Sequence, residues 1–596
     1  EKLISASIND GKAVYNVNIN ALIVTKTITN AAEYANWINI AKACEESATL
    51  WGGYFRLGAN ITTTSMVMFN RGAIDGSEGF KGVFDGCGYT IDGLNRSSWD
   101  YNAFVTTMTN TGVLRNIAFT NVKITGEGNF LTSGGKGTIE NVFVQYAVIS
   151  VGSPYNGTIA NFKEGCAMRN VFVDASKAAV SGNGAQFRIL TAGTSSGFGG
   201  VFGICPSENY TPSQAIGDRG NNYSAIAYFT TFAELKAKTE TQSVLSAWND
   251  NGFWIVKDGV PMPKNLTVTA FNLGAKDIDL DVMVDGDNVS LNDSTVTFDC
   301  FAIGFDFAQA VSLTMDGNNV EFAEGDVTVS GGVLSIKRSI FGFAYGEKNI
   351  VITDVDGKTI TVSATLVTKT LMNATDYANW IKIANACEAE NQILGGYFRL
   401  GANIVSETMV TFDRYDVDGA YGFKGVFDGC GYAIDGLTAT GNAFISCMTK
   451  DGVLRNIAFT NAKIAGGSNF LCSGGLGTIE NVYVQYVSIA AGTDNNGTIY
   501  NHCRDGQEGG KIAGVFVDAS QATLSGTGSK FRLLGGNSTG YNGIFAVCPD
   551  GYTLTQARDT GSFADQAVSA FATFDDLKNN STTQSVLATW SSTYWT

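Results

Sequence analysis

The side chains of this sequence that could do chemistry include 11 cysteines and one histidine. No two cysteines have the C-x-x-C spacing typical of zinc ligands, so the sequence predicts neither a metal site nor a bound cofactor. Cys447 and Cys472 lie 25 residues apart, which equals a step between similar strands described below. This spacing predicts that they stack on neighbouring turns of the chain. They form either a disulfide or, as we expect, two buried free thiols that pack like small apolar groups.

Acidic and basic residues that recur along the chain are the other candidates for catalysis. A glycoside hydrolase needs two carboxyl groups ~5–10 Å apart, and a polysaccharide lyase needs a base beside a group that neutralises the substrate carboxylate. Arg115 and Glu140 occupy equivalent positions on successive strands, and their spacing predicts a weak ion pair on the outer surface. His502 is expected in a solvated loop, and the corresponding region near Phe162 has no histidine. We therefore expect no catalytic residues and no enzymatic activity.

Tyrosines in or beside predicted loops are the better indication of a binding site, because flat aromatic rings commonly contact sugars. The alternative is that these rings pack against the body of the fold. The candidate ligand contacts are Tyr101, Tyr146, Tyr155, Tyr210 and Tyr223.

The chain contains two copies of one long sequence. GGYFRLGANI at 52–61 returns at 395–404, GFKGVFDGCGY at 79–89 returns at 422–432, and GVLRNIAFTN at 112–121 returns at 452–461. The step from 52 to 395 is 343 residues. The second copy ends early, and residues 1–21 are similar to the segment that begins at 347. We therefore expect a parent protein that continues in both directions.

A shorter period lies inside each copy. Asparagines recur beside apolar pairs at steps of 25 and 29 residues in the first copy, and residues two apart on a strand face the same side. The apolar pairs therefore point into one core, while asparagine marks a corner where its amide can bond the next turn. The predicted ladder consists of Asn116, Asn141 and Asn170, and of Asn456 and Asn481 in the second copy, where Gly514 takes the third place.

Two other segments complete each copy. Asn30 and Glu33 have the spacing of a capping box, and apolar residues from Tyr34 to Cys44 follow at helical spacing. A short amphipathic helix is therefore expected to cover the open end of the coil. Between the copies, residues 264–366 alternate short apolar runs with Gly, Asn and Asp turns, which predicts an immunoglobulin-like sandwich without the Cys/Trp/Cys signature.

Together these motifs resemble the repetitive parallel β-helix and immunoglobulin-like modules of large surface proteins from Gram-positive bacteria. The resemblance covers both copies through YFRLGANI, FKGVFDGCGYTIDGL (80–94) and the strands that end in NIAF and NVFV. It implies an all-β chain of two right-handed parallel β-helix modules, each with a short N-terminal capping helix, separated by an immunoglobulin-like β-sandwich. The expected segments are 1–21 as the C-terminal tail of a preceding spacer, 22–263 as the first β-helix repeat, 264–366 as the spacer, and 367–596 as the second, truncated repeat.

Composition excludes several classes of partner. The net charge is -16 at pH 7 and no basic stripe is present, so nucleic acid and anionic membrane surfaces are disfavoured. No stretch approaches the roughly 18 apolar residues of a spanning helix, so no membrane insertion is expected in this segment. Charged residues make up only 16% of the chain and Gly accounts for 71 of 596 residues, which is typical of a β-rich surface protein.

The sequence therefore predicts a non-catalytic extracellular repeat protein, associated with the cell surface or cell wall, that acts in adhesion or display. Its partners would be a glycan, a host surface protein or neighbouring copies of itself, because many weak identical contacts combine through avidity. A polysaccharide-degrading β-helix enzyme, either lyase or glycoside hydrolase, is one alternative, and a tight acid cluster on one face would favour it. A structural subunit of a filament, envelope layer or phage fibre is the other.

Overall fold

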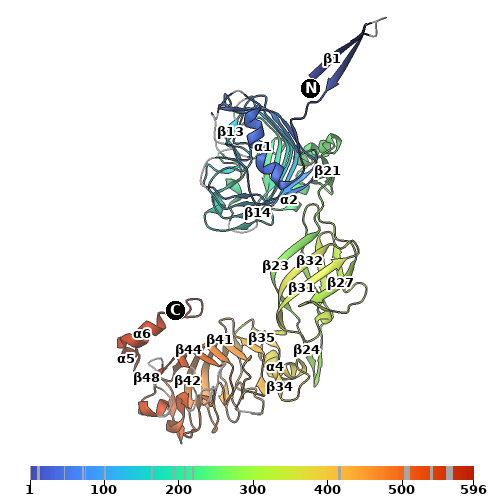
Figure 1. Cartoon of the computed structure of the whole chain (residues 1–596). Coiled ribbons are helices and arrows are strands. Elements are labelled where there is room, and N and C mark those ends of the chain that lie inside the picture. Colours follow the sequence, from blue (N-terminus) through green and yellow to red (C-terminus); the bar gives the residue numbers. More distant parts are fainter. Residues whose placement is uncertain are drawn as a thin grey trace. The chain divides into compact units, whose positions relative to one another are not determined.

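The computed structural model describes residues 2–9, 14–45, 47–69, 73, 75–98, 102–162, 165–192, 195–206, 210–217, 221–413, 418–502, 510–536, 541–558 and 568–595. The chain forms two compact units, Glu1–Val268 and Thr269–Thr596, and each is described here by itself (Figure 1). Both units are predominantly β and contain long parallel sheets, as the sequence predicts.

A long parallel sheet runs through the first unit. Its strands pair in the order of the chain, so the chain makes a crossover before each new strand. They are β3 (Lys26–Ile28), β5 (Tyr54–Leu57), β8 (Val83–Asp85), β12 (Val113–Ile124), β14 (Thr138–Ile149), β16 (Ala167–Asp174), β19 (Phe198–Ile204) and β20 (Ile226–Phe229), with β6 (Ile61–Thr62), β9 (Thr90–Asp92), β10 (Asn95–Arg96) and β17 (Ala179–Val180) beside them. We call this part module 1.

Equivalent residues face one another across these strands. Leu114 of β12 lies opposite Ile139 of β14, which lies opposite Met168 of β16, and all three side chains are buried. Shorter parallel strands form a further set on each turn, namely β4 (Leu50–Trp51), β7 (Gly79–Phe80), β11 (Thr107–Met108) and β13 (Gly134–Gly135), followed by β15 (Gly157–Ala160) with β18 (Arg188–Ala192). Side chains from both sets belong to one buried core.

Helix α1 (Ala31–Ala43) packs its apolar face onto the first turns of module 1. The Asn30 side chain accepts a hydrogen bond from the backbone N–H of Glu33, which is the first half of the predicted capping box. The Glu33 carboxylate accepts from the Thr29 N–H instead of the Asn30 N–H. The helix buries Trp37, whose ring lies 4.8–5.8 Å from the ring centroids of Phe55, Phe69, Phe80, Phe84 and Phe104. Cys44 is the C-cap residue and is exposed, so it does not belong to the buried stripe.

A C-terminal segment covers the outer side of this long sheet. It contains α2 (Phe232–Ala237), α3 (Thr239–Ser246), β21 (Trp254–Lys257) and β22 (Val260–Pro263). The outward rings of the sheet pack against it, since Trp248 stacks on Phe202 and Trp254 contacts Phe143 edge-on. At the other end of the unit, β1 (Lys2–Asn9) and β2 (Val14–Ala21) form an antiparallel hairpin.

The second unit begins with residues 270–367, which we call the two-sheet segment. Its five-stranded sheet contains β23 (Ala270–Asp279), β32 (Thr359–Val367), β31 (Gly346–Asp354), β27 (Ala310–Met315) and β28 (Asn318–Asn319). A three-stranded sheet of β26 (Thr295–Asp299), β30 (Val333–Lys337) and β29 (Val327–Ser330) and the hairpin β24 (Met283–Asp285) with β25 (Asn288–Ser290) complete it. Only the β23–β32 pair is parallel.

Module 2 follows and repeats the topology of module 1. Helix α4 (Ala374–Ala386) buries Trp380 against the first turns, as α1 buries Trp37. The long sheet contains β33 (Lys369–Leu371), β35 (Tyr397–Leu400), β38 (Val426–Asp428), β41 (Val453–Ile464), β42 (Thr478–Ile489), β44 (Lys511–Asp518), β47 (Tyr541–Val547) and β48 (Val568–Phe571). Shorter strands lie beside it, namely β36 (Ile404–Val405), β39 (Ala433–Asp435), β40 (Thr438–Ala439) and β45 (Thr523–Leu524), with β34 (Ile393–Leu394), β37 (Gly422–Phe423), β43 (Gly497–Tyr500) and β46 (Arg532–Gly536) in separate sheets and α5 (Phe574–Asn579) and α6 (Ser581–Leu587) at the end.

Candidate functional site

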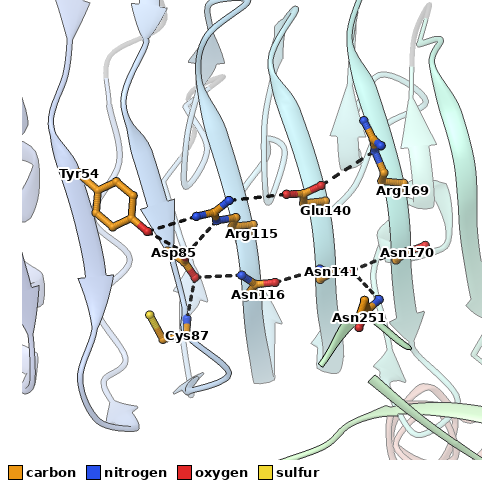
Figure 2. Close-up of polar contacts among 10 residues, drawn as sticks. All are labelled: Tyr54, Asp85, Cys87, Arg115, Asn116, Glu140, Asn141, Arg169, Asn170 and Asn251. Atoms are coloured by element: carbon orange, nitrogen blue, oxygen red, sulfur yellow. Dashed lines mark hydrogen bonds and ion pairs between the residues drawn. The ribbon is translucent and has the colours of Figure 1, made fainter. Parts of the chain in front are cut away.

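The polar side chains shared by both copies meet on the outer side of the long sheet. In module 1 the centre of this cluster is Asp85, which is almost fully buried at the end of β8. Its Oδ2 accepts a hydrogen bond from Arg115 Nε at 2.8 Å and another from the Tyr54 hydroxyl at 3.1 Å (Figure 2). Arg115 also donates to the Tyr54 hydroxyl oxygen at 3.2 Å, so strands β5, β8 and β12 are joined by one triangle of contacts.

The second carboxylate oxygen of Asp85 is also occupied. Oδ1 accepts from the backbone N–H of Cys87 at 2.9 Å and from Asn116 Nδ2 at 3.1 Å. Burial by itself would raise the pKa of Asp85, but these bonds and that from Arg115 outweigh it and hold the pKa below its ordinary value. Asp85 is therefore an ionised acceptor that ties neighbouring turns together, and it is a poor general acid.

From Asp85 a line of asparagine amides crosses the sheet. Asn116 Oδ1 accepts from Asn141 Nδ2 at 2.9 Å, and Asn141 Oδ1 accepts from Asn170 Nδ2 at 2.9 Å and from Asn251 Nδ2 at 2.9 Å (Figure 2). The φ angles of Asn116, Asn141 and Asn170 are 51°, 54° and 55°, a left-handed conformation that asparagine tolerates better than most residues. One residue type thus supplies both the sharp corner and the bond between turns.

Module 2 repeats this arrangement and then interrupts it. Asn456 Nδ2 donates to Asp428 Oδ1 at 3.1 Å, and Asn481 Nδ2 donates to Asn456 Oδ1 at 3.0 Å. Gly514 holds the third corner at a φ of 61°, so the corner persists where the amide is missing. A Cβ added at Gly514 would lie 3.0 Å from Asn481 Oδ1.

A second polar link between turns was not anticipated from the sequence. Asp92 Oδ1 accepts from Thr120 Oγ1 and from Asn121 Nδ2, both at 2.7 Å. In module 2 Asp435 Oδ1 accepts in the same way from Thr460 at 2.6 Å and from Asn461 at 2.7 Å. The sequence contains a sign of this link, because the pairs ID and TN recur in both copies. Asn121 and Asn461 also adopt a positive φ, as the asparagines of the ladder do.

The predicted ion pair between Arg115 and Glu140 is long. Arg115 lies 4.0 Å from Glu140, which in turn lies 4.0 Å from Arg169, and all three side chains are partly exposed. Arg115 contacts Asp85 more closely than Glu140 because the guanidinium folds back toward β8. These outer charges contribute little to stability on their own.

The predicted tyrosine contacts do not form one site. Tyr146 is 1% exposed and its hydroxyl bonds Thr158 Oγ1, so the prediction of a ligand contact is wrong there. Tyr210 is partly buried, and its hydroxyl donates to the Phe187 carbonyl. Burial raises the pKa of both phenols. Tyr223 is half-buried under Lys238, whose Nζ lies 3.7 Å from the ring centroid. Tyr155 is 75% exposed, and Tyr101 lies outside the described residues.

An exposed aromatic position that both copies share was missed. Tyr89 is 37% exposed and its counterpart Tyr432 is 40% exposed, whereas Ile91, two residues after Tyr89, is fully buried. The preceding turn explains the difference, because Cys87 has a φ of 51° and Tyr89 N–H bonds the Gly86 carbonyl, which places the ring outside the core.

Cys447 and Cys472 are buried and are not joined in a disulfide. The two cysteines lie on neighbouring turns but not opposite one another, because Cys472 pairs in register with Ile445, and Met448 beside Cys447 pairs with Gly475. The step along this set of strands is 27 residues, from 445 to 472, whereas the step of 25 holds from β41 to β42. The turns differ in length between the faces, so a spacing taken from one face misplaces a pair on the other.

His502 is also placed differently from the prediction of a solvated loop. Its side chain is wholly buried, its Nε2 lies 2.7 Å from the Gly477 carbonyl oxygen, and its Nδ1 lies 3.7 Å from Cys472 Sγ. It takes the place of Phe162, since His502 pairs with Gly475 as Phe162 pairs with Gly135. Burial lowers the pKa of His502 to about 4, and the Gly477 bond only partly offsets this effect.

Within the parts of the chain that the structure describes, no three His, Cys, Asp or Glu side chains are grouped so that they could hold a metal ion. Among the same residues no helix is both long enough and apolar enough to cross a membrane. The chain matches no protein-family model, no curated protein and no solved structure.

The ladder predicts the effect of completing it at Gly514. We expect Gly514→Asn to stabilise the second unit by about 1 kcal/mol, because the new amide can donate to Asn481 as Asn170 does to Asn141. Gly514→Ala is the matched control and should destabilise it by about 1 kcal/mol, because alanine is strained at a positive φ and supplies no amide. Urea unfolding of each variant measures the difference, and equal effects of the two substitutions would contradict a ladder bond.

Burial of His502 predicts a pH dependence of stability. Because its folded pKa of about 4 lies below the ordinary 6.5, the neutral side chain contributes stability that is present above pH 6.5 and is lost as the pH falls toward 4. His502→Phe, which copies module 1, should remove this loss. Urea unfolding gives the free energy of unfolding of the variant minus that of the unchanged chain. This difference should be about 2 kcal/mol larger at pH 4.5 than at pH 8. A difference independent of pH would show that His502 does not titrate in this way.

Proposed function

We propose that the chain is a non-catalytic extracellular surface repeat protein that acts in adhesion or display. In this proposal the two modules are right-handed parallel β-helices, and the two-sheet segment is an immunoglobulin-like spacer. The parallel pairing of strands at steps of 24–33 residues supports the first assignment, and the two small sheets of short strands support the second.

The observation that carries the proposal is the use of the shared carboxylates. Asp85 holds Arg115, Asn116, Tyr54 and a backbone amide, and Asp92 holds Thr120 and Asn121. Asp174, a further acid shared by both copies, accepts from the Ser176 N–H and hydroxyl. A polysaccharide hydrolase needs a carboxyl group whose pKa is raised so that it can donate a proton, whereas the pKa of Asp85 is lowered.

Repetition supports binding rather than turnover. Two modules that present the same outer residues can engage a repetitive partner twice, and the combined affinity then exceeds that of either contact. Both copies expose a ring at Tyr89 and its counterpart Tyr432, whereas Tyr155 has Asn495 at the corresponding position. A surface glycan fits this pattern, because flat rings present an apolar face to sugars.

The proposal predicts binding without product formation. The intact chain is incubated with plant, mucin and bacterial polysaccharides, and mass spectrometry of the supernatant should detect no released oligosaccharide above a heat-denatured control. Retention on the best-binding polysaccharide should fall at least about tenfold for the double variant Tyr89→Ala and Tyr432→Ala, because loss of both sites removes avidity. Tyr155→Ala serves as the matched exposed control. Oligosaccharides that appear only with the folded chain would overturn the proposal.

A further inference from the structure

The hairpin β1–β2 has one polar face and one apolar face. On the polar face Ser5 donates to Asn18 across the two strands. On the other face Ile4 lies opposite Ile19, and these side chains are 48% and 56% exposed. Two-stranded hairpins are at best marginally stable in water, and contiguous exposed apolar side chains mark interaction surfaces.

The two-sheet segment contains a corresponding hairpin whose apolar face is buried. Its last strands, β31 and β32, are antiparallel and pair Ile350 with Val362 as β1 and β2 pair Ile4 with Ile19. The sequences align from Glu1–Lys2 with Glu347–Lys348 and through VTKT at 24–27 and 367–370. Ile350 and Val362 are both fully buried, so the positions that are exposed in β1–β2 are core positions in the two-sheet segment.

The junction between hairpin and module is also the same in both places. Thr25 donates its N–H to the Tyr54 carbonyl at 2.8 Å and accepts the Tyr54 N–H on Oγ1 at 2.9 Å. Thr368 makes the same two bonds with Tyr397, at 2.8 and 2.9 Å. The residue that begins each module is therefore anchored by the same two bonds, although β32 runs to Val367 and β2 already ends at Ala21.

Within the second unit, aspartates in and just after strand β23 form ion pairs with the first strands of module 2. Asp277 pairs with Arg399 at 2.8 Å, and Asp281, just after β23, pairs with Lys369 at 2.5 Å. Module 1 keeps both cations, as Arg56 and Lys26. In module 1 Lys26 instead contacts Glu33 at 2.6 Å; the equivalent residue in module 2 is Asp376, which is one methylene shorter and bonds the Met372 N–H.

We propose that β1–β2 and the adjoining Lys26 and Arg56 form a docking surface for an incomplete two-sheet partner of the β23–β30 type. The partner covers the Ile4 and Ile19 face, pairs its first strand in parallel with β2 as β23 pairs with β32, and brings aspartates to Lys26 and Arg56 as Asp281 and Asp277 come to Lys369 and Arg399. The proposal concerns assembly and does not depend on what the modules bind.

The experiment supplies such a partner and measures hydrogen exchange. A second copy of residues 267–346 is placed directly before Glu1 of the full chain, so that Gly346 of the added copy precedes Glu1 as it precedes Glu347. Amides of β1–β2 should then exchange at least about 100-fold more slowly than in the unextended chain and approach the rates of β31–β32, which are the reference in the same molecule. Ile4→Asp with Ile19→Asp in the extended chain should restore fast exchange, whereas Ser5→Ala with Asn18→Ala, on the polar face, should not.

A trans format keeps the test decisive if the extended chain fails to fold. The segment 267–346 is added as a separate polypeptide to the unextended chain, and protection of residues 2–9 and 14–21 is measured in the complex. Protection in either format, lost with the Ile4 and Ile19 substitutions, supports the proposal. Fast exchange of β1–β2 in both formats overturns it. Protection that rises with the concentration of the unextended chain alone assigns the surface to self-association and also overturns it.

Discussion

Parallel stacking imposes one constraint on which the rest of each module depends. Every turn of the chain must bring its next strand back in register with the last, so the same corner has to recur at the same place on each turn. The structure meets this requirement with a left-handed residue at Asn116, Asn141 and Asn170, and at Asn456, Asn481 and Gly514. Because Gly514 keeps this conformation without an amide, the conformation itself is what the corner requires. Asparagine at the other corners adds a bond to the next turn.

The outer polar residues follow from that constraint. The amides and carboxylates at successive corners lie on the outer side of the sheet and close to one another. Asp85 and Asp428 are the first acceptors of the asparagine ladders in modules 1 and 2. Side chains that resemble a catalytic cluster in the sequence are thereby saturated by their neighbours. What the two copies leave exposed, such as Tyr89 and Tyr432, is what a partner can reach.

The sequence predicts those parts of the structure that repeat. The 343-residue repeat, the parallel strands, the capped helices and the ladder positions each appear as a period in residue types that backbone geometry explains. The sequence does not predict residues outside that period. Cys447 and Cys472 follow the step of a different face, His502 fills the position of Phe162 and not a loop, and the Tyr146 hydroxyl bonds Thr158 Oγ1 in the interior. Burial of a single residue depends on turn lengths that no local pattern encodes.

If the shared polar residues hold the turns together, a double-mutant cycle on Asn116 and Asn141 will show that the two side chains are coupled. Asn116→Gly and Asn141→Gly keep the left-handed corner and remove the amides, so the coupling free energy isolates the bond between the two side chains. Urea unfolding of the first unit should give a coupling of about 1 kcal/mol. A coupling near zero would show that these amides do not join the turns and would leave the side chains free to serve a ligand.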